Sequence, residues 1–345
     1  MNDQTATTLP SLSVILVAGS GAASVARTVW HMRQQTVRNR IEFIVVVAHL
    51  DEVREMKLAQ SEFFAVNVLA VGPISERGDA AARGIMVAQS PIVALIEDHS
   101  FPEAEWADAL IRAHAGPWAG VGPRVENANP ATARSCVNFL LSYVTFSGTQ
   151  SAGPRELIPW HNSAYKRDSL APFMNRLGHL LTWEGDLQDE LRAAGHTLYF
   201  EPAARTHHAN VSRFTSTIRQ NFHRGRVMGA IRAKCERWPR WRALAYAAAF
   251  PLYPLAQLRR LLPVLSQQRY APAMRVRVML VLGPVLWAAA VGEAFGVLTG
   301  AGNAFLEMDN FDLHRLSHVT REERREIVEF VGVHDSHKAP VRRSA

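Results

Sequence analysis

The stretch that decides the fold is PIVALIEDHS, residues 91–100. It joins a continuous apolar run to three side chains that can do chemistry, Glu97, Asp98 and His99. An apolar run without alternation is typical of a strand buried on both faces of a parallel sheet. Its polar end admits two interpretations, the corner of a metal site or a strand that runs out into water. On a strand Glu97 and His99 share one face and Asp98 points to the other, but the alternation relaxes at a strand end, where all three can reach one cleft.

Other apolar runs alternate with helical patterns on both sides of this stretch. Strands are predicted at 12–19, 41–49, 64–72 and 118–126, and helices at 28–35, 76–90 and 102–116. This alternation predicts an α/β fold with a mostly parallel sheet and helices on both faces. Ligands of such sheets bind beyond the carboxyl ends of the strands. Ala18, the pair 48–49 and the triplet 97–99 all fall there.

Composition limits the function classes. The chain has 345 residues, 48% of them hydrophobic, and a formal net charge of +7. A sizeable core is therefore expected, and the basic surplus favours an anionic partner such as a nucleotide or a lipid head group. Cys136 and Cys235 have no metal-type spacing and predict a reducing compartment. The polar segment 1–10 lacks the pattern of an export signal and is expected to be disordered.

The C-terminal third differs from the rest of the chain. Arginines crowd residues 205–277 and alternate with apolar runs, which favours a membrane surface over nucleic acid. Prolines interrupt the run 241–258, whereas 278–300 is long enough to cross a bilayer but contains Glu293. A carboxylate near mid-membrane costs about 2.5–3.5 kcal/mol on insertion scales. Three arrangements stay open: helices lying in the cytoplasmic face of the membrane, one or two crossings, and burial within a soluble oligomer.

Two further motifs offer chemistry. In TWEGDLQDEL, Glu184 and Asp186 stand at a helix start with Thr182 as the expected N-cap, and the helix dipole favours their charged forms. In EPAARTHH, the tandem histidines His207 and His208 follow a predicted strand. Taken alone, each motif is explained more simply, as ordinary helix-start acids and as structural histidines.

In their order along the chain these motifs resemble the family 2 glycosyltransferases, inverting enzymes of the GT-A type fold. The resemblance runs from about Leu12 to Arg226. SVILVAG and IEFIVVVAHLDE look like the first two strands of that family, IVALIEDHSFPEAEW like the strand with its DxD motif, WHNSAYKRDSL like its acceptor-side segment, and WEGDLQDELRAAGHTLYFEPAARTHH like its stretch of base, helix, strand and histidine.

The resemblance implies a domain plan. It gives a GT-A domain at 11–228, with a donor half at 11–125 and an acceptor half at 126–228. Beyond the resemblance, the apolar runs predict membrane-associated helices at 229–302, and the composition predicts a polar tail at 303–345.

Carried over residue by residue, the resemblance also implies a base and a divalent-metal site. Glu184 falls where the family places its general base. Glu97 and His99 stand at the outer positions of the DxD motif and His208 matches a histidine near the metal or diphosphate, so these three are the implied ligands of Mg²⁺ or Mn²⁺. The implied donor- or diphosphate-binding residues are Ala18, Asp51, Arg83, Glu97, Asp98, Arg224 and Arg226. The implied acceptor-side residues are Trp160, His161, Asn162, Trp183 and Asp186.

The chain also departs from the family pattern. His99 replaces an acid, which keeps a ligand but removes a negative charge. Ala48 and His49 replace acids of the second strand that contact the nucleotide. The usual Arg–Asn pair is missing, and Arg83 or Arg77 could supply the cation in its place.

We therefore expect an inverting glycosyltransferase that moves a sugar from a nucleotide-sugar donor to a lipid-linked or glycan acceptor at the cytoplasmic face of the membrane. The partners are the donor, the acceptor and the membrane surface, with no nucleic acid. The alternative from another class is a non-catalytic, degenerate GT-A domain that acts as a membrane-associated scaffold. A nucleotidyltransferase would need a basic glycine-rich loop after the first strand, where AGSGAASVAR offers only Arg27.

Overall fold

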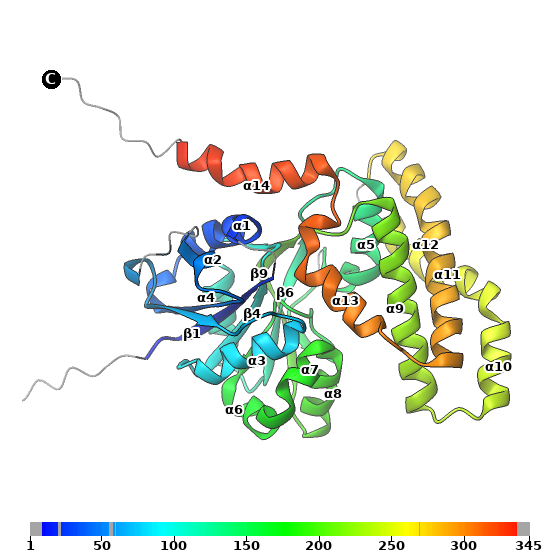
Figure 1. Ribbon diagram of the computed structural model, residues 1–345, viewed down its shortest axis with the longest axis horizontal. Helices are drawn as coiled ribbons and strands as arrows, with labels where there is room; N and C mark the ends of the chain where they lie inside the picture. Colours follow the sequence, from blue (N-terminus) through cyan, green and yellow to red (C-terminus); the bar gives the residue numbers. More distant parts are fainter. Residues whose placement is uncertain are drawn as a thin grey trace, which may run out of the picture. The chain divides into compact units, whose positions relative to one another are not determined.

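The computed structural model describes residues 9–19, 22–54, 58, 60–148, 150–268 and 270–336 (Figure 1). The predicted disordered segment 1–10 lies almost wholly outside these residues, as does the basic end after residue 336. The described chain forms two compact units. The first comprises 1–126, 146–207 and 325–345, and the second 127–145 and 208–324. The predicted domain boundaries at 125 and 228 stay predictions.

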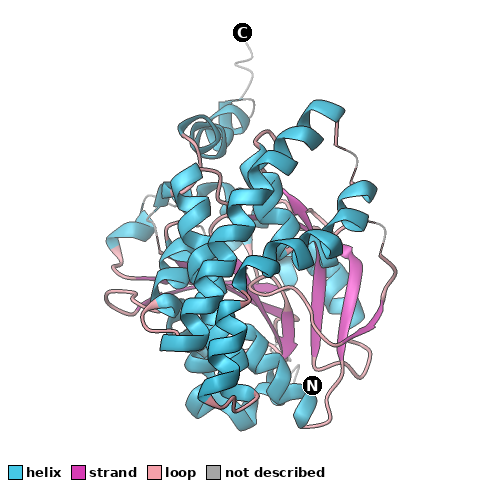
Figure 2. Ribbon diagram, turned by 90° about the vertical axis from the view of Figure 1, so that its right-hand side faces the viewer, coloured by secondary structure: helices cyan, strands magenta, loops and turns pink. Residues whose placement is uncertain are grey.

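The first unit is built around one sheet, whose strands are magenta in Figure 2. The strands are β1 (Leu12–Ala18), β2 (Ile41–Val47), β3 (Ala65–Ala70), β4 (Ile92–Glu97), β5 (Ser100–Pro102), β6 (Gly120–Asn127), β7 (Gly153–Arg155), β8 (Ala164–Lys166) and β9 (Leu198–His208). Their order is β3-β2-β1-β4-β8-β6-β9-β5, with β7 paired to β9. The helices of this unit are α1 (Ala22–Arg33), α2 (Asp51–Arg54), α3 (Arg77–Val87), α4 (Trp106–Ala113), α6 (Arg167–Leu170), α7 (Leu177–Thr182) and α8 (Glu184–Ala193).

The four leading strands of the sheet are parallel, as the sequence predicts. Beyond β4 the sheet is mixed, because β8 pairs antiparallel with both β4 and β6. The register sets Ala18 of β1 opposite Val47 of β2, and Val17 of β1 opposite Glu97 of β4. The carboxyl ends of β1, β2 and β4 therefore reach the same edge of the sheet, which is where ligands of such sheets bind.

The two faces of these strands carry different helices. Leu16 and Ile96 belong to one apolar cluster with side chains of α1 and α4. Ile15 and Val46 have the opposite parity and meet α3, where a side chain on Gly84 would overlap Ile15. Both faces are covered, which explains why the strands read as continuous apolar runs.

The second unit is helical. Its helices are α5 (Ala133–Ser142), α9 (Phe214–Cys235), α10 (Arg240–Ala248), α11 (Tyr253–Gln267), α12 (Pro272–Thr299) and α13 (Ala304–Leu313), and α14 (Arg321–Ser336) begins here and ends in the first unit. Helices α9 and α12 lie side by side (Figure 1). Cys136 and Leu140 of α5 pack with Val278, Leu282 and Val285 of α12 in the core. Among the described residues, α12 alone is long and apolar enough to cross a membrane, judged by length and composition.

Candidate functional site

The carboxyl edge of the parallel strands ends in a buried polar turn, the acid–imidazole corner of Glu97, Asp98 and His99. Glu97 is the last residue of β4, and β5 begins at Ser100. Glu97 and Asp98 are each 4% exposed and His99 is 1% exposed. The interpretation of this stretch as a strand end in water is therefore wrong, because all three side chains are buried.

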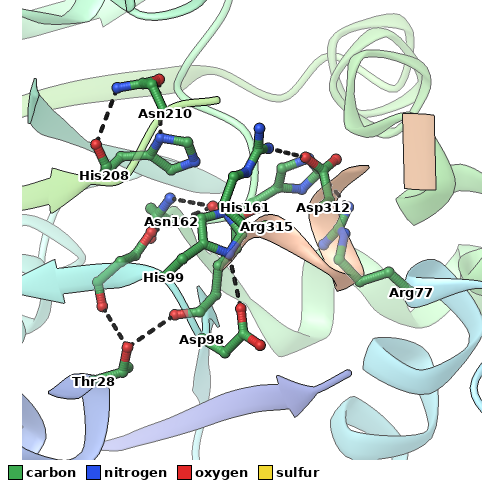
Figure 3. Close-up of polar contacts among 12 residues, drawn as sticks. Thr28, Arg77, Asp98, His99, His161, Asn162, His208, Asn210, Asp312 and Arg315 are labelled. Carbon is green, nitrogen blue, oxygen red and sulfur yellow. Dashed lines mark hydrogen bonds and ion pairs between the residues drawn. The ribbon is translucent and has the colours of Figure 1, made fainter. Parts of the chain in front are cut away.

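His99 lies between the two carboxylates, and Figure 3 shows its contact with Asp98. Its Nδ1 is 2.8 Å from Asp98 Oδ1, and its Nε2 is 3.4 Å from Glu97 Oε1. Strict alternation would have turned Asp98 away from His99, but β4 ends at Glu97 and the alternation relaxes there. When Nδ1 donates to Asp98, Nε2 is the ring nitrogen that can bind a metal. Carboxylates orient metal-binding imidazoles in the same way.

Helix α1 holds the turn of the corner in place. Ser24 Oγ donates to Asp98 Oδ2 at 3.0 Å, and Thr28 Oγ1 donates to the Ser100 carbonyl at 2.9 Å. The two hydroxyls are one helical turn apart and so lie on the same side of α1. The sequence analysis did not identify either residue. The available signal was their place on a helix that follows β1 at the ligand-binding edge of the sheet.

Asn162, which was predicted to lie on the acceptor side, reaches the corner in the structure. Its Nδ2 donates to Glu97 Oε2 at 3.1 Å (Figure 3), and Ser100 Oγ donates to the same oxygen at 3.3 Å. Asn162 is fully buried. The Glu97 carboxylate is thus fixed through Oε2 by two donors, and its Oε1 faces His99.

Two buried side chains, Arg77 and His161, contact each other, and His161 directly precedes Asn162 in the sequence. Arg77 Nη2 lies 3.3 Å from His161 Nε2 and donates to the Leu181 carbonyl at 3.1 Å. His161 has a left-handed backbone with φ of 68°, a conformation that costs a non-glycine residue about 1–2 kcal/mol. Of the two cations that the sequence offers on α3, Arg77 is buried and Arg83 is exposed.

The predicted acceptor-side tryptophans are also together. The rings of Trp160 and Trp183 meet edge to face with centroids 4.5 Å apart, and Gly185 lies against both. Helix α8 starts at this point, and the Asp186 amide donates to the Trp183 carbonyl at 2.8 Å. Glu184 is the first residue of α8, and its side chain lies outside the described part of the structure.

The prediction that Thr182 caps this helix is wrong. Thr182 is the last residue of α7, and its hydroxyl donates to the Gly178 carbonyl at 3.2 Å. The N-cap of α8 is Trp183, which makes no side-chain capping bond. Thr182 instead belongs to the short helix α7, which the hydrophobic periodicity of the sequence did not predict.

The second unit holds His208, the last residue of β9. Its Nε2 lies 3.2 Å from Tyr143 Oη, its Nδ1 lies 3.2 Å from Asn210 Oδ1 (Figure 3), and its ring centroid is 4.5 Å from that of Tyr143. His207 points to the other side of the strand and pairs with Glu103 at 3.0 Å. Strand alternation thus buries one histidine of the tandem and leaves the other partly exposed.

The remaining predicted donor residues are spread over both units. Ala18 ends β1, and the exposed Asp51 begins α2. In the second unit Arg224 donates to Ser142 Oγ, and burial lowers the pKa of its guanidinium. Arg226 Nε donates to the Gly300 carbonyl at 3.1 Å. Both guanidinium groups therefore have protein partners in this structure.

The donor atoms of the corner suit a divalent cation. Carboxylate oxygen and imidazole nitrogen are ligands that Mg²⁺ or Mn²⁺ accepts. Glu97 and His99 belong to the groups of side chains whose positions could hold a metal ion, and Asp98 provides the carboxylate that orients the imidazole. The corner therefore fits the metal implied by the resemblance, while His208 as its third ligand stays a prediction.

Comparison with known proteins identifies the fold. No family model and no curated protein matches the sequence. The mannosyltransferase PcManGT from Pyrobaculum calidifontis, solved with GDP-Man and Mn²⁺, is similar over 83% of this chain and 88% of its own, with 17% identity and a TM-score of 0.50. GalNAc-T7, solved with UDP, GalNAc and Mn²⁺, is similar over 59% of this chain with 14% identity and a TM-score of 0.45, and the match spans 44% of its length. The likeness to the mannosyltransferase confirms the predicted fold class, an α/β fold of GT-A type.

Proposed function

We propose that the chain is a metal-dependent inverting glycosyltransferase that uses a nucleotide-sugar donor. The observation that carries the proposal is the buried acid–imidazole corner at the carboxyl edge of a GT-A type sheet. Burying two carboxylates is costly unless each is hydrogen-bonded or paired with a cation. A site that receives a metal and a diphosphate explains why the chain keeps Glu97 and Asp98 there.

Glu97 and His99 are the metal ligands in this proposal, with His208 as the third. A bound divalent metal would stabilise the negative charge that develops on the leaving diphosphate. Glu97 presents Oε1 because Asn162 and Ser100 occupy Oε2. Asp98 fixes the ring of His99 rather than contacting the diphosphate itself. This role also accounts for a histidine at the position where the family has an acid.

Glu184 is the general base of the proposed reaction. Its carboxylate takes the proton of the acceptor hydroxyl, the oxygen forms a bond to the anomeric carbon, and the bond from that carbon to the diphosphate breaks on the opposite face. The nucleoside diphosphate leaves, and the configuration is inverted. A helix start favours the ionised form that such a base needs, and Glu184 is the first residue of α8.

The acceptor binds at the tryptophan pair. Trp160 and Trp183 offer apolar ring surface beside the start of α8, and Asp186 and His161 are the proposed polar contacts of the acceptor. Asn162 serves the acceptor side only indirectly, since its amide is bound to Glu97. Ala18, Asp51, Arg83, Arg224 and Arg226 remain the proposed donor contacts.

The acceptor is a lipid-linked sugar or a glycan at the cytoplasmic face of the membrane. Exposed apolar side chains of the second unit support this location, as do the arginines among them. Basic, apolar helices of this kind bind membrane surfaces.

The test uses purified protein, a panel of labelled UDP-, GDP- and dTDP-sugars, and Mn²⁺. We expect one donor to be hydrolysed or transferred, and Glu184→Gln to abolish turnover while nucleoside diphosphate binding stays within about twofold. Asp189→Asn is the matched control, because Asp189 is an exposed acid on the same helix. Full turnover in Glu184→Gln would remove the base assignment. Binding of no nucleotide in the panel would favour the scaffold alternative.

A further inference from the structure

Helix α12 presents a continuous apolar stripe to solvent. Val276, Leu280, Trp287, Phe295 and Leu298 are 46–72% exposed. Their spacings of three, four, seven and eight residues keep them on one side of the helix. The stripe is about 33 Å long at 1.5 Å per residue, and from Leu280 to Leu298 it contains no charged residue.

Helices α10 and α11 carry more exposed apolar groups. Trp241 and Leu244 of α10 are 71% and 61% exposed, and Leu255 of α11 is 61% exposed. Arg259 follows Leu255 by four residues and Leu262 follows Arg259 by three, so the three share a face of α11. We call the exposed sides of α10, α11 and α12 the outer face. Arginines amid leucines and tryptophans are typical of helices that lie on membranes.

The charge of this region is almost wholly positive. Between residues 237 and 306 the sequence has one acid, Glu293, and these eight arginines: Arg237, Arg240, Arg242, Arg259, Arg260, Arg269, Arg275 and Arg277. Glu293 is 2% exposed, lies 3.0 Å from Arg232 and accepts a hydrogen bond from Tyr246 at 2.6 Å. It therefore offers no negative charge to a partner. An anionic surface is complementary to the outer face.

The opposite side of α12 is bound to α9 by backbone contacts. A side chain on Gly225 of α9 would overlap the Ala289 carbonyl, and one on Gly229 would overlap that of Glu293. Gly292 and Gly296 of α12 lie in the same way against α9. The residue numbers of the contacting positions increase in the same direction on both helices, so α9 and α12 run parallel. Glycines four residues apart let the two backbones come together.

This packing is incompatible with a membrane crossing by α12 alone. Helix α9 carries Arg219, His223, Arg224, Arg226 and Arg232, spread over most of its length. If α12 crossed a bilayer, α9 would have to cross with it and bring these basic side chains into the hydrocarbon. Charged side chains in that position are strongly unfavourable.

We propose that the outer face docks in the plane of an anionic membrane and that α12 does not cross it. Trp241, Leu255 and Leu280 enter the interface, and Arg259 and Arg260 bind lipid phosphates. The inference deepens the membrane location that is part of the proposed function, and it chooses one of the three arrangements left open by the sequence. Docking does not depend on sugar transfer, so each can fail without the other.

Flotation of the full chain with vesicles tests the proposal. The vesicles are phosphatidylcholine alone, or a roughly 3:1 mixture of phosphatidylcholine and phosphatidylglycerol. We expect binding to the mixed vesicles at least tenfold stronger than to the neutral ones, weakened by salt and reversed by alkaline carbonate. Protein that stays in the membrane after carbonate would show a crossing and overturn the in-plane docking. Equal binding to both vesicles would overturn the charge argument.

Variants of the outer face have matched controls elsewhere. The double variant Leu255→Ser and Leu280→Ser should lower binding at least tenfold, and Arg259→Gln about fivefold. Met86→Ser and Arg38→Gln change exposed residues of the first unit and should leave binding unchanged. The chain could instead fail to bind vesicles and form a dimer in light scattering, and the double leucine variant could be a monomer. That result would show that a second copy covers the outer face, and it would overturn the proposal. Nucleotide binding, measured in parallel, reports on the proposed function alone.

Discussion

The acid–imidazole corner and the contact of α9 with α12 are built on opposite principles. In the corner, side chains of β4, α1 and the segment before β8 hold one another by hydrogen bonds. Between α9 and α12, glycines remove the side chains so that backbone meets backbone. The corner should tolerate loss of a polar atom without unfolding but lose its chemistry. The helix contact has no chemistry to lose, yet should tolerate no added atom.

The largest expected effect separates chemistry from stability in the corner. Glu97→Gln keeps the shape of the side chain and removes the negative charge. Sugar transfer should fall about 10²–10³-fold, the size of losing one charge-stabilising group in an active site. The free energy of unfolding should change little, because an amide can still accept from Asn162 and Ser100. Turnover with the active donor and urea unfolding measure the two quantities, and Glu126→Gln in the same unit is the control. Normal turnover would show that Glu97 has no part in the reaction.

The helix contact should show the reverse behaviour. Gly292→Ala places a methyl group on the carbonyl of Phe222, and overpacking of this kind costs about 1–3 kcal/mol. Gly283→Ala is the control on the same helix, since a side chain at Gly283 meets nothing within 4 Å. An alanine there should raise stability by about 0.5–1 kcal/mol. Urea unfolding of both variants gives the comparison. If both variants are equally stable, the backbones of α9 and α12 are not in close contact at Gly292.

The corner shows what the sequence could predict. Continuous apolar runs predict buried strands, and parallel strands must bring Ala18, Val47 and Glu97 to one edge. The grouping of Glu97, Asp98 and His99 follows from that edge alone. The hydrogen bonds from Ser24 and Asn162 could not be predicted, because they depend on which rotamers meet across elements 65 to 74 residues apart.

The second unit shows where the sequence analysis was limited. In the sequence Glu293 lies in the middle of an apolar run and is expected near mid-membrane, whereas the structure pairs it with Arg232, 61 residues earlier, and with Tyr246. The pairing of Glu293 and the facing glycines of α9 and α12 each involve segments far apart in the sequence. Neither can be predicted from the residues of one helix alone. Hydropathy therefore indicated a possible span, and the partner helix argues against it.

A smaller effect tests how the corner orients its imidazole. Asp98→Asn keeps an acceptor for the Nδ1 proton but removes the charge that holds the ring of His99. Loss of such a supporting carboxylate costs about 10–100-fold in metal affinity. Titration of Mn²⁺ followed by electron paramagnetic resonance measures this without any sugar donor. Ser24→Ala, which removes one bond to Asp98, should have a smaller effect. Unchanged affinity in Asp98→Asn would assign Asp98 to another role, such as the predicted donor contact.

The smallest expected effect compares the units under acid. Burial lowers the pKa of His114 in the first unit to about 4, with the charge of Lys166 acting in the same direction, and burial also lowers the pKa of His318 in the second unit to about 4. The unfolded pKa is near 6.5, so the unfolded chain binds more protons below that pH. Stability is fully present above about pH 6.5 and is lost as the pH falls toward 4. Between pH 7 and 5.5, protonation of His114 in the unfolded chain should lower the free energy of unfolding by about 1 kcal/mol.

Replacing the two histidines in turn assigns that loss to the units. His114→Phe should flatten the decline of the free energy of unfolding between pH 7 and 5.5, while His49→Gln, at an exposed position, should leave it unchanged. His318→Phe should flatten it by a similar amount, because burial lowers the pKa of His318 to the same value, about 4. If the two effects add in the double variant, the histidines titrate independently, and the larger single effect identifies the more acid-sensitive unit. If His114→Phe leaves the pH dependence of the unfolding free energy unchanged, His114 is already protonated in the folded chain. The packing around His114 would then tolerate an unpaired charge, whereas the charged groups of the corner are paired with one another.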